Sequence, residues 1–145
     1  MSQSTRFAVA VHVAVLLAEF EGKPATSAAI ARSVNTNPVV VRRVLGSLAA
    51  AGLVESERGA SGGSRLARPA GKLTLRDLYR AVGEGELCPM HDIGRSPGCP
   101  VARAIGPVLT GIVERASSAM EDELSRTTLT DVLAQVKAKA AKTAA

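Results

Sequence analysis

Aromatic residues are almost missing from this chain of 145 residues, which contains no Trp, one Tyr and two Phe. Proteins that hold single-stranded nucleic acids stack the bases on exposed aromatic rings, so this composition argues against such a platform. Catalytic motifs are missing as well. The sequence has neither a phosphate-binding glycine loop nor an HExxH metal motif, and His12, His91 and the two cysteines form no recognisable triad. We therefore expect that the protein is not an enzyme.

The chain also lacks a hydrophobic run long enough to cross a bilayer. The most apolar segment, Phe7–Leu17, is too short, is interrupted by His12 and precedes no clear small-residue cleavage site. It predicts a buried first helix over roughly Thr5–Glu21. We expect no membrane segment and no signal peptide, and the predicted localisation is cytoplasmic.

The next segment has the pattern of two short helices joined by a tight turn. Thr26 and Ser27 offer cap oxygens for a helix over Ala28–Ser33, and Asn37-Pro38 supplies the cap residue and the first-turn proline of another helix. The segment between them, Val34–Thr36, has the length that such a turn requires. Together these signals predict a helix-turn-helix.

The second of these helices has one buried stripe and one free side. Apolar residues recur at i, i+3, i+4 and i+7 as Val41, Val44, Leu45 and Leu48. The other faces carry Val39, Arg42, Arg43, Gly46 and Ser47. Arginines on the free side of a helix in this motif favour contact with DNA.

A small β-hairpin, here called the wing, follows. Gly52 is placed to end the helix, and strands are predicted over Leu53–Glu57 and Ser64–Arg68 with a Gly-rich loop between them. Arg58 and Arg65 flank this loop, whose small residues suit insertion into a minor groove. The predicted fold class is mostly α with a small β-wing, as a winged helix-turn-helix plus a long dimerisation helix.

Positive charge is concentrated in the half that carries this motif. Residues 1–82 hold 11 Lys and Arg against 5 Asp and Glu, a net charge of +6, whereas residues 83–145 hold 7 against 8, a net charge of −1. A basic excess on one domain is the electrostatic signature of a phosphate-binding surface. With so few aromatic rings, double-stranded DNA is favoured over RNA.

Three further helices are predicted beyond the wing. The first has helical spacing in Leu75, Leu78, Tyr79 and Val82. The second is long, with a spacing close to that of a coiled coil in Val101, Ile105, Val108 and Ile112. Pro107 either kinks this helix or marks its start. The last is signalled by Thr128 with Asp131 three residues on.

We divide the chain into four parts on this basis. They are a DNA-binding domain over residues 1–83, a Gly/Pro/Cys-containing sensor loop over 84–98, dimerisation helices over 99–136 and a flexible basic tail over 137–145. Two-fold pairing of the long helix through residues 100–126 would bury its apolar seam and place two reading helices on a palindromic site. The alternative is that this helix folds back on its own domain.

These segments resemble the Rrf-type family of winged-helix transcription regulators over about residues 4–136. The likeness is carried by LAAAGLVES, RGASGGSRLAR, LTLRDLYRAVGE and GCPVARAI. The resemblance implies a homodimeric bacterial repressor that reads a palindromic operator with this helix and wing. Carried over by position, the implied DNA contacts are Ser27, Asn37, Val39, Arg42, Arg43, Arg58, Ser64 and Arg65. The wing departs from the family pattern at Ser64, where an aromatic residue is frequent.

The sensing chemistry depends on Cys88 and Cys99, which have ten residues between them in the predicted loop. The iron–sulfur members of the family use three cysteines there, and this chain lacks the middle one. Ala8 and Ala102 stand where cluster-binding relatives supply further ligands. Because a cluster requires four ligands, the set for this chain would be Cys88, Cys99, His12 and His91. No cofactor is favoured, and an iron–sulfur cluster is kept as the alternative.

Thiol chemistry is the preferred interpretation. Cys99 directly precedes Pro100, a residue suited to the first helical position, so its sulfur would face the free amides of the long helix. Such an environment favours the thiolate, which is the form that oxidants attack. Cys88 would then resolve the oxidised thiol as a disulfide, within one chain or across the dimer. A further alternative is a DNA-binding protein with inert cysteines that is controlled by a metabolic enzyme or a small-molecule effector.

Overall fold

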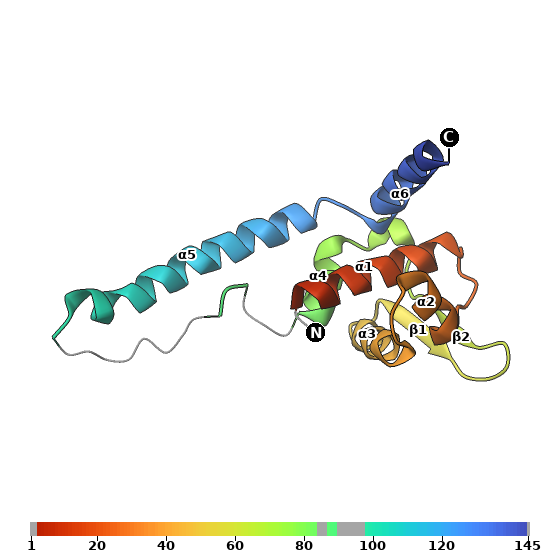
Figure 1. Ribbon diagram of the computed structural model, residues 1–145, viewed down its shortest axis with the longest axis horizontal. Coiled ribbons are helices and arrows are strands. Elements are labelled where there is room, and N and C mark those ends of the chain that lie inside the picture. The colour runs from red at the N-terminus through yellow and green to blue at the C-terminus, as the bar shows by residue number, and fades with distance from the viewer. Residues whose placement is uncertain (1–2, 84–86, 90–97, 145) are drawn as a thin grey trace.

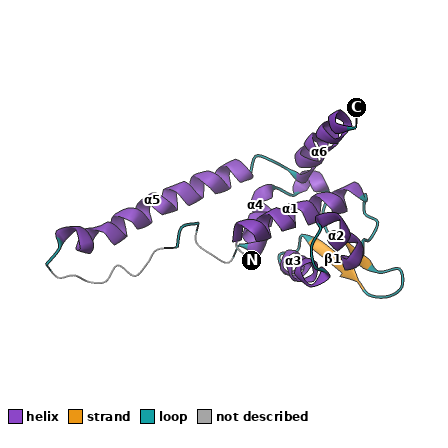
Figure 2. Cartoon of the chain, viewed as in Figure 1, coloured by secondary structure: helices purple, strands orange, loops and turns teal. Residues whose placement is uncertain are grey.

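The computed structural model describes residues 3–83, 87–89 and 98–144. A compact body carries the winged helix-turn-helix, and one long helix extends from it as an arm (Figure 1). Figure 2 shows that helices dominate, and the described residues form a single two-stranded sheet, so the predicted class, mostly α with a small β-wing, is confirmed. The dimerisation role of the long helix stays a prediction. No helix in these ranges is both long and apolar enough to cross a membrane. The elements are α1 (Gln3–Glu19), α2 (Ser27–Val34), α3 (Pro38–Ala50), β1 (Val54–Glu57), β2 (Gly63–Leu66), η1 (Ala70–Lys72), α4 (Leu75–Val82), α5 (Pro100–Leu124) and α6 (Leu129–Thr143).

The first helix forms the centre of the body. α1 contacts α2, α3, α4, α6 and β2. Its Val13 and Leu17 are fully buried, as are Leu48 of α3 and Leu78 of α4. Burial of each such side chain stabilises the fold by about 1.5–3 kcal/mol. The apolar run near the N-terminus is therefore the core of the domain, as its sequence predicts.

The elements of the winged domain follow the predicted order with small shifts of their ends. α1 ends at Glu19 instead of Glu21 because Glu21 and Gly22 turn the chain with φ angles of +49° and +85°. Gly52 follows α3 with a φ of +72°, as expected of a residue that ends a helix. The two strands pair antiparallel from Val54 opposite Leu66, and each is four residues long, slightly shorter than predicted.

The C-terminal helices differ more from the predictions. α5 begins at Pro100 and continues through Pro107, so Pro107 does not mark its start. This helix leaves the body as an arm instead of folding back on it (Figure 1). α6 extends to Thr143, so most of the segment predicted as a flexible basic tail over 137–145 is helical, because its alanines and lysines are strong helix formers. Lys137 of this segment pairs with Glu19 of α1 at 3.0 Å.

Two capping boxes begin α4 and α6. Thr74 N donates a hydrogen bond to Asp77 Oδ2 at 2.8 Å, and Asp77 N donates to Thr74 Oγ1 at 3.3 Å. Thr128 and Asp131 repeat the arrangement with distances of 2.8 and 3.2 Å. The hydrogen bonds from the backbone and side chain of Thr128 lower the pKa of Asp131 below its usual value. The second box confirms the predicted start of the last helix.

The two capping boxes are joined to each other. Their threonines form an antiparallel β-bridge. In it, Leu75 N donates to Thr127 O at 3.0 Å and Leu129 N donates to Leu73 O at 2.9 Å. Both Leu73 and Leu129 are fully buried. The segment that follows the arm is therefore anchored in the core of the winged domain.

The wing is attached to the body by a second bridge. The backbones of Ala25 and Ser64 exchange two hydrogen bonds of 2.9 and 2.8 Å. Gly63 enters this contact with a φ of +155°, and a Cβ atom there would lie 2.7 Å from the backbone of Ala25. Glycine alone tolerates both the backbone angle and the close approach.

Gly63→Ala should therefore destabilise the protein by about 1–3 kcal/mol, because the added methyl group meets backbone atoms that cannot move aside. Unfolding in urea, followed by far-ultraviolet circular dichroism, measures this change. Gly46→Ala is the matched control: its added methyl group has nothing within 4 Å. Alanine also stabilises a helix by about 1 kcal/mol relative to glycine. Equal stability of the two variants would contradict this account of the wing.

Candidate DNA-binding surface

Caps on both sides of the turn position α3. Thr26 Oγ1 accepts a hydrogen bond from Ala29 N at 3.2 Å and begins α2. Asn35 ends α2 in the left-handed conformation, with a φ of 56°. Asn37 Oδ1 then accepts from Val39 N at 2.8 Å and begins α3. The second and third helices of the domain are thus held at a fixed angle by local hydrogen bonds, as the sequence predicts.

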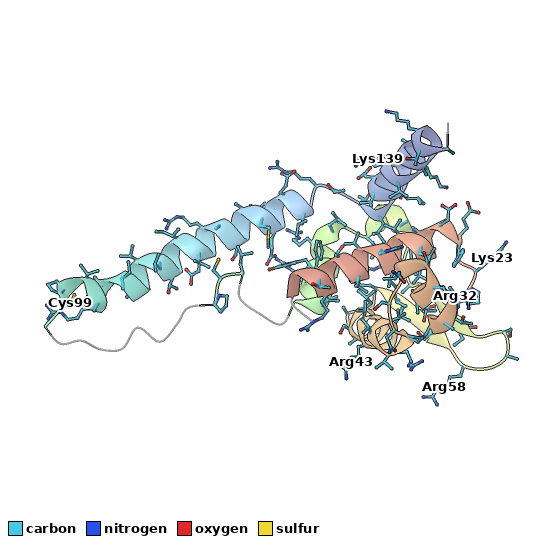
Figure 3. The ribbon with its side chains drawn as sticks, viewed as in Figure 1. Lys23, Arg32, Arg43, Arg58, Cys99 and Lys139 are labelled. Carbon is cyan, nitrogen blue, oxygen red and sulfur yellow. The ribbon has the colours of Figure 1, made fainter. Side chains whose placement is uncertain are left out.

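One side of α3 is open to solvent. Its predicted apolar stripe is buried against the body, whereas Val39 is 45% exposed. Arg42 and Arg43 are also exposed, and within the described ranges neither is engaged by an ion pair. Figure 3 shows Arg43 directed away from the body on the same side as Arg58 of the wing. This side presents two unpaired cations at a helix surface that fits a major groove.

Two depressions flank the open side of α3. The first, of about 350 Å³, lies between α3 and the wing and is lined by residues that include Ser27, Arg42 and Ser56. The second, of about 580 Å³, lies between α3 and the start of α1, where Arg6 and Arg43 line it together. Arg6 is not among the DNA contacts predicted from the sequence. No local motif marks it, since only the packing of α1 brings it beside α3.

The two arginines of the wing have different surroundings. Arg65 forms ion pairs with Glu55 at 3.4 Å and with Glu57 at 2.9 Å. Arg58 is exposed, and no acidic partner is recorded for it in the part of the chain that the structure describes. Arg65 therefore offsets one of the two negative charges of Glu55 and Glu57, whereas Arg58 remains open to a phosphate. The predicted phosphate contact fits Arg58 better than Arg65.

Two of the predicted DNA contacts have tasks within the fold. Ser64 is 5% exposed, and its hydroxyl oxygen lies 2.8 Å from that of Ser56. This hydrogen bond joins the two strands and leaves little of the Ser64 side chain open to DNA. Asn37 is exposed, but its side-chain oxygen Oδ1 caps α3, so only the NH2 group of its side chain is left for another contact. Ser27 is half-buried at the edge of the first depression.

Cys99, one of the two predicted sensing residues, lies apart from this surface. Cys99 caps α5, and its Sγ accepts a hydrogen bond from Ala102 N at 3.5 Å. Its position before Pro100 predicts this cap. The thiol is free and half-buried, at the end of the arm remote from the body (Figure 3). Cys88 is also a free thiol and is exposed.

The ligand set considered for an iron–sulfur cluster is not assembled in the described residues. His12 Nε2 lies 3.3 Å from Ser33 Oγ, at the contact between α1 and α2. His91 lies outside the described residues. Among the residues described, no three or more His, Cys, Asp or Glu side chains gather closely enough to hold a metal ion.

Residues 3–135 match Rrf2, a family described as iron-dependent transcriptional regulators. The chain belongs to the Rrf2 family. This Rrf2 protein is 40% identical over 131 residues to YwnA of Bacillus subtilis strain 168, which is named as an HTH-type transcriptional regulator; the match covers 90% of this chain and 96% of YwnA. The resemblance found in the sequence is thus confirmed, and the chain is a transcriptional regulator of this family.

Solved structures of other proteins have the same Rrf2 fold. IscR from T. potens is 28% identical, with a TM-score of 0.68 over 94% of this chain and 88% of IscR. An oxidized form of CymR from Staphylococcus aureus is also 28% identical, with a TM-score of 0.65 over 92% of this chain and 96% of CymR. The overall fold of this chain is therefore similar to those of IscR and CymR.

Arg43→Ala should weaken binding to a duplex selected by the protein from a random library by about 10- to 100-fold and relax the base preference, because a base-reading side chain is lost. Fluorescence anisotropy with the selected duplex and with single-base variants measures both effects. Arg126→Ala removes an exposed arginine remote from α3 and is the control. Unchanged binding by the Arg43 variant would remove this residue from the reading surface.

Arg58→Ala should lower the slope of log affinity against log salt concentration by about one, because one phosphate contact fewer releases one counterion fewer. Arg65→Ala should leave that slope unchanged, since its guanidinium is held by Glu55 and Glu57. Titrations at several salt concentrations compare the two variants. An unchanged slope for Arg58→Ala together with a lower slope for Arg65→Ala would instead assign the phosphate contact to Arg65.

Proposed function

We propose that this Rrf2 protein is a homodimeric repressor that binds a palindromic duplex through α3 and the wing, and that releases it when Cys99 is oxidised. The observation that carries the first half is the open side of α3, with unpaired Arg42 and Arg43 beside the wing. The observation that carries the second is the free thiol at the first turn of α5.

DNA reading follows from the shape and charge of this surface. α3 enters a major groove with Val39, Arg42 and Arg43 toward the base edges. The wing lies along the neighbouring minor groove, where Arg58 meets the backbone phosphates. Arg6 extends the positive surface to the other side of α3. These contacts supply both base selection and salt-dependent affinity.

The arm supports pairing with a second copy. α5 has 25 residues, none of them buried. Its seam residues Val101, Val108 and Ile112 are 68%, 55% and 47% exposed. A single helix about 37 Å long with an exposed apolar stripe gains stability when a partner covers that stripe. A two-fold pair covers both seams at once and gives each dimer two reading helices.

Val108→Glu combined with Ile112→Glu should convert the dimer to a monomer, because four like charges then meet in an apolar interface. Sedimentation velocity measures the mass in solution. Thr110→Glu is the control, because Thr110 lies on the opposite side of α5 from the seam and is exposed. A double variant that stays dimeric would place the interface elsewhere.

In the proposed switch, a hydroperoxide oxidises Cys99 in two steps that end in a disulfide. The Cys99 thiolate attacks the distal peroxide oxygen, the O–O bond breaks, and an alcohol or water leaves as Cys99 becomes a sulfenic acid. The thiol of Cys88 then attacks the sulfenic sulfur, a disulfide forms, and water leaves. The thiols are oxidised and the peroxide is reduced. The solved oxidized form of the relative CymR supports this choice of signal. A cross-link at the end of α5 would change the geometry of the arm and the spacing of the two reading helices.

Cys99→Ser should keep the affinity of the reduced protein for DNA but make release insensitive to peroxide, because the attacking sulfur is gone. Cys88→Ser should stop the reaction at the sulfenic acid, which dimedone labels on Cys99. Anisotropy with and without hydrogen peroxide, together with mass spectrometry, measures these states. Peroxide-induced release by the Cys99 variant would exclude this thiol as the sensor.

An iron–sulfur regulator is the second candidate, favoured by the description of the family as iron-dependent and by the likeness to IscR. The donor set of the described residues does not fit it, since a cluster requires four ligands and these residues offer two thiols and no assembled group. The visible absorption spectrum of protein purified without oxygen decides between the two. Iron–thiolate bands would overturn the thiol switch, and a spectrum without them would exclude the cluster.

A further inference from the structure

Gly46 is a glycine that the fold itself does not require. It lies in the interior of α3 and is exposed, and a Cβ atom added there would have nothing within 4 Å. Its φ angle lies outside the left-handed region, unlike that of Gly52, which follows the helix with a φ of +72°. Alanine in place of a glycine inside a helix shifts the unfolding equilibrium toward the folded state by about fivefold. Gly46 therefore lowers stability, and no contact within the described residues accounts for it.

This glycine belongs to the open side of α3. Four exposed residues at i, i+3, i+4 and i+7 share that side, namely Val39, Arg42, Arg43 and Gly46. From the first to the last of them the helix rises by about 10 Å. A DNA strand advances by about 3.4 Å per base, so this side of α3 matches about three base pairs.

Gly46 also separates the two depressions that flank α3. It belongs to the lining of both, whereas Arg42 lines the one toward the wing and Arg43 the one toward α1. The ridge between the depressions is therefore bare backbone at Gly46. Glycine is the usual residue where a backbone approaches a ligand closely, because no side chain holds the two apart.

The charges on both sides of this ridge favour an anionic ligand. The depression toward α1 contains the guanidinium groups of Arg6 and Arg43, with no acidic side chain in its described lining. The depression toward the wing contains Arg42 and Glu57, and Glu57 is paired with Arg65 at 2.9 Å. A DNA duplex has a sugar–phosphate strand on each side of its major groove. The bare ridge between two cationic depressions matches that arrangement.

We propose that Gly46 is the point of closest approach between α3 and the base edges of a DNA duplex. A helix with its side chains is about 10–12 Å across and the major groove is about 12 Å wide, so an added side chain is sufficient to lift the helix. The bare backbone lets α3 lie deep in the groove, where Arg42 and Arg43 reach the bases. Gly46 is thus a positioning residue for the two arginines. This inference rests on the proposed function and adds to it the residue that sets the depth of binding.

The test compares Gly46→Ala and Gly46→Leu in the full-length protein. Gly46→Ala should raise the midpoint of urea unfolding, because alanine is the better helix former and the methyl group has free space. The same variant should bind a duplex selected by the parent protein about 5- to 20-fold more weakly, and Gly46→Leu at least about 100-fold more weakly, as contacts to the bases are lost. A glycine with a purely structural role would not give a gain in stability together with a loss in binding.

A duplex of random sequence provides a second measurement. Non-specific binding depends on phosphate contacts, so Gly46→Ala should change the affinity for this duplex by less than about twofold and leave its salt dependence unaltered. Arg43→Ala removes a charge and should weaken binding to both duplexes. Fluorescence anisotropy with the selected and the random duplex measures the ratio of the two affinities, which Gly46→Ala alone should lower without loss of charge.

Ala138→Leu is the matched control for added bulk. Ala138 is an exposed small residue of a helix, as Gly46 is, but it belongs to α6. Its neighbour Lys139 lies far from Arg43 (Figure 3). This variant should keep the parent affinity for both duplexes. Sedimentation velocity should give the same mass for all variants, so that a loss of binding is not a loss of assembly.

Three results would overturn the role of Gly46 while the proposed function stands. The first is an unchanged affinity of Gly46→Ala for the selected duplex. The second is a lower stability of this variant, because the fold would then require the glycine. The third is an equal loss for the selected and the random duplex, because phosphates and not base edges would then lie against the helix. A parent protein that selects no duplex at all would instead refute the proposed function, and this inference with it.

Discussion

The junction between the two capping boxes is the constraint on which the rest of the structure depends. Thr74 and Thr128 begin their own helices and also bridge to each other, so one short contact fixes the starts of α4 and α6 together. Leu73 and Leu129 bury this contact in the core. α5 ends directly before it, and its direction is therefore set by the winged domain. This junction and the ion pair between Arg80 of α4 and Glu121 of α5 together attach the arm to the winged domain.

The arginines on the open side of α3 and in the wing differ in whether acidic side chains pair with them. Arg42 and Arg43 stand free on the helix, whereas Arg65 is held by the carboxylates of its own hairpin. A free guanidinium can form bidentate contacts with a base edge. A paired guanidinium, such as that of Arg65, offsets the negative charge of nearby carboxylates and links the two strands. The number of arginines near a surface is therefore a poor measure of how many contact DNA.

Local signals in the sequence predict most of this fold. Asn37 before Pro38 marks the start of α3, and Thr128 with Asp131 marks α6, because caps act over three or four residues. The features that were not predicted join distant segments. Arg6 reaches the side of α3 only through the packing of α1, and the two depressions beside α3 depend on how α1 and the wing pack against it. Pairings through space leave no pattern in a single chain.

The candidate site also shows which features a single sequence predicts and which it does not. Family position suggests Ser64 as a DNA contact, but its burial follows from the hydrogen bond to Ser56 across the hairpin. The cap made by Cys99 is again local, and the residue before a first-turn proline is sufficient to predict it. The oxidation proposed for this thiol would depend on groups distant in the sequence, which no local pattern predicts.

The length of α5 decides where the proposed oxidation of Cys99 would act. Its 25 residues span about 37 Å, and Cys99 caps the end that lies remote from its own winged domain. If two arms pair antiparallel, each thiol lies beside the body of the neighbouring chain. The proposed switch would then act in trans, because oxidation of one subunit would change DNA binding by the other. A mixed dimer of intact and thiol-free subunits would in that case release one half-site before the other.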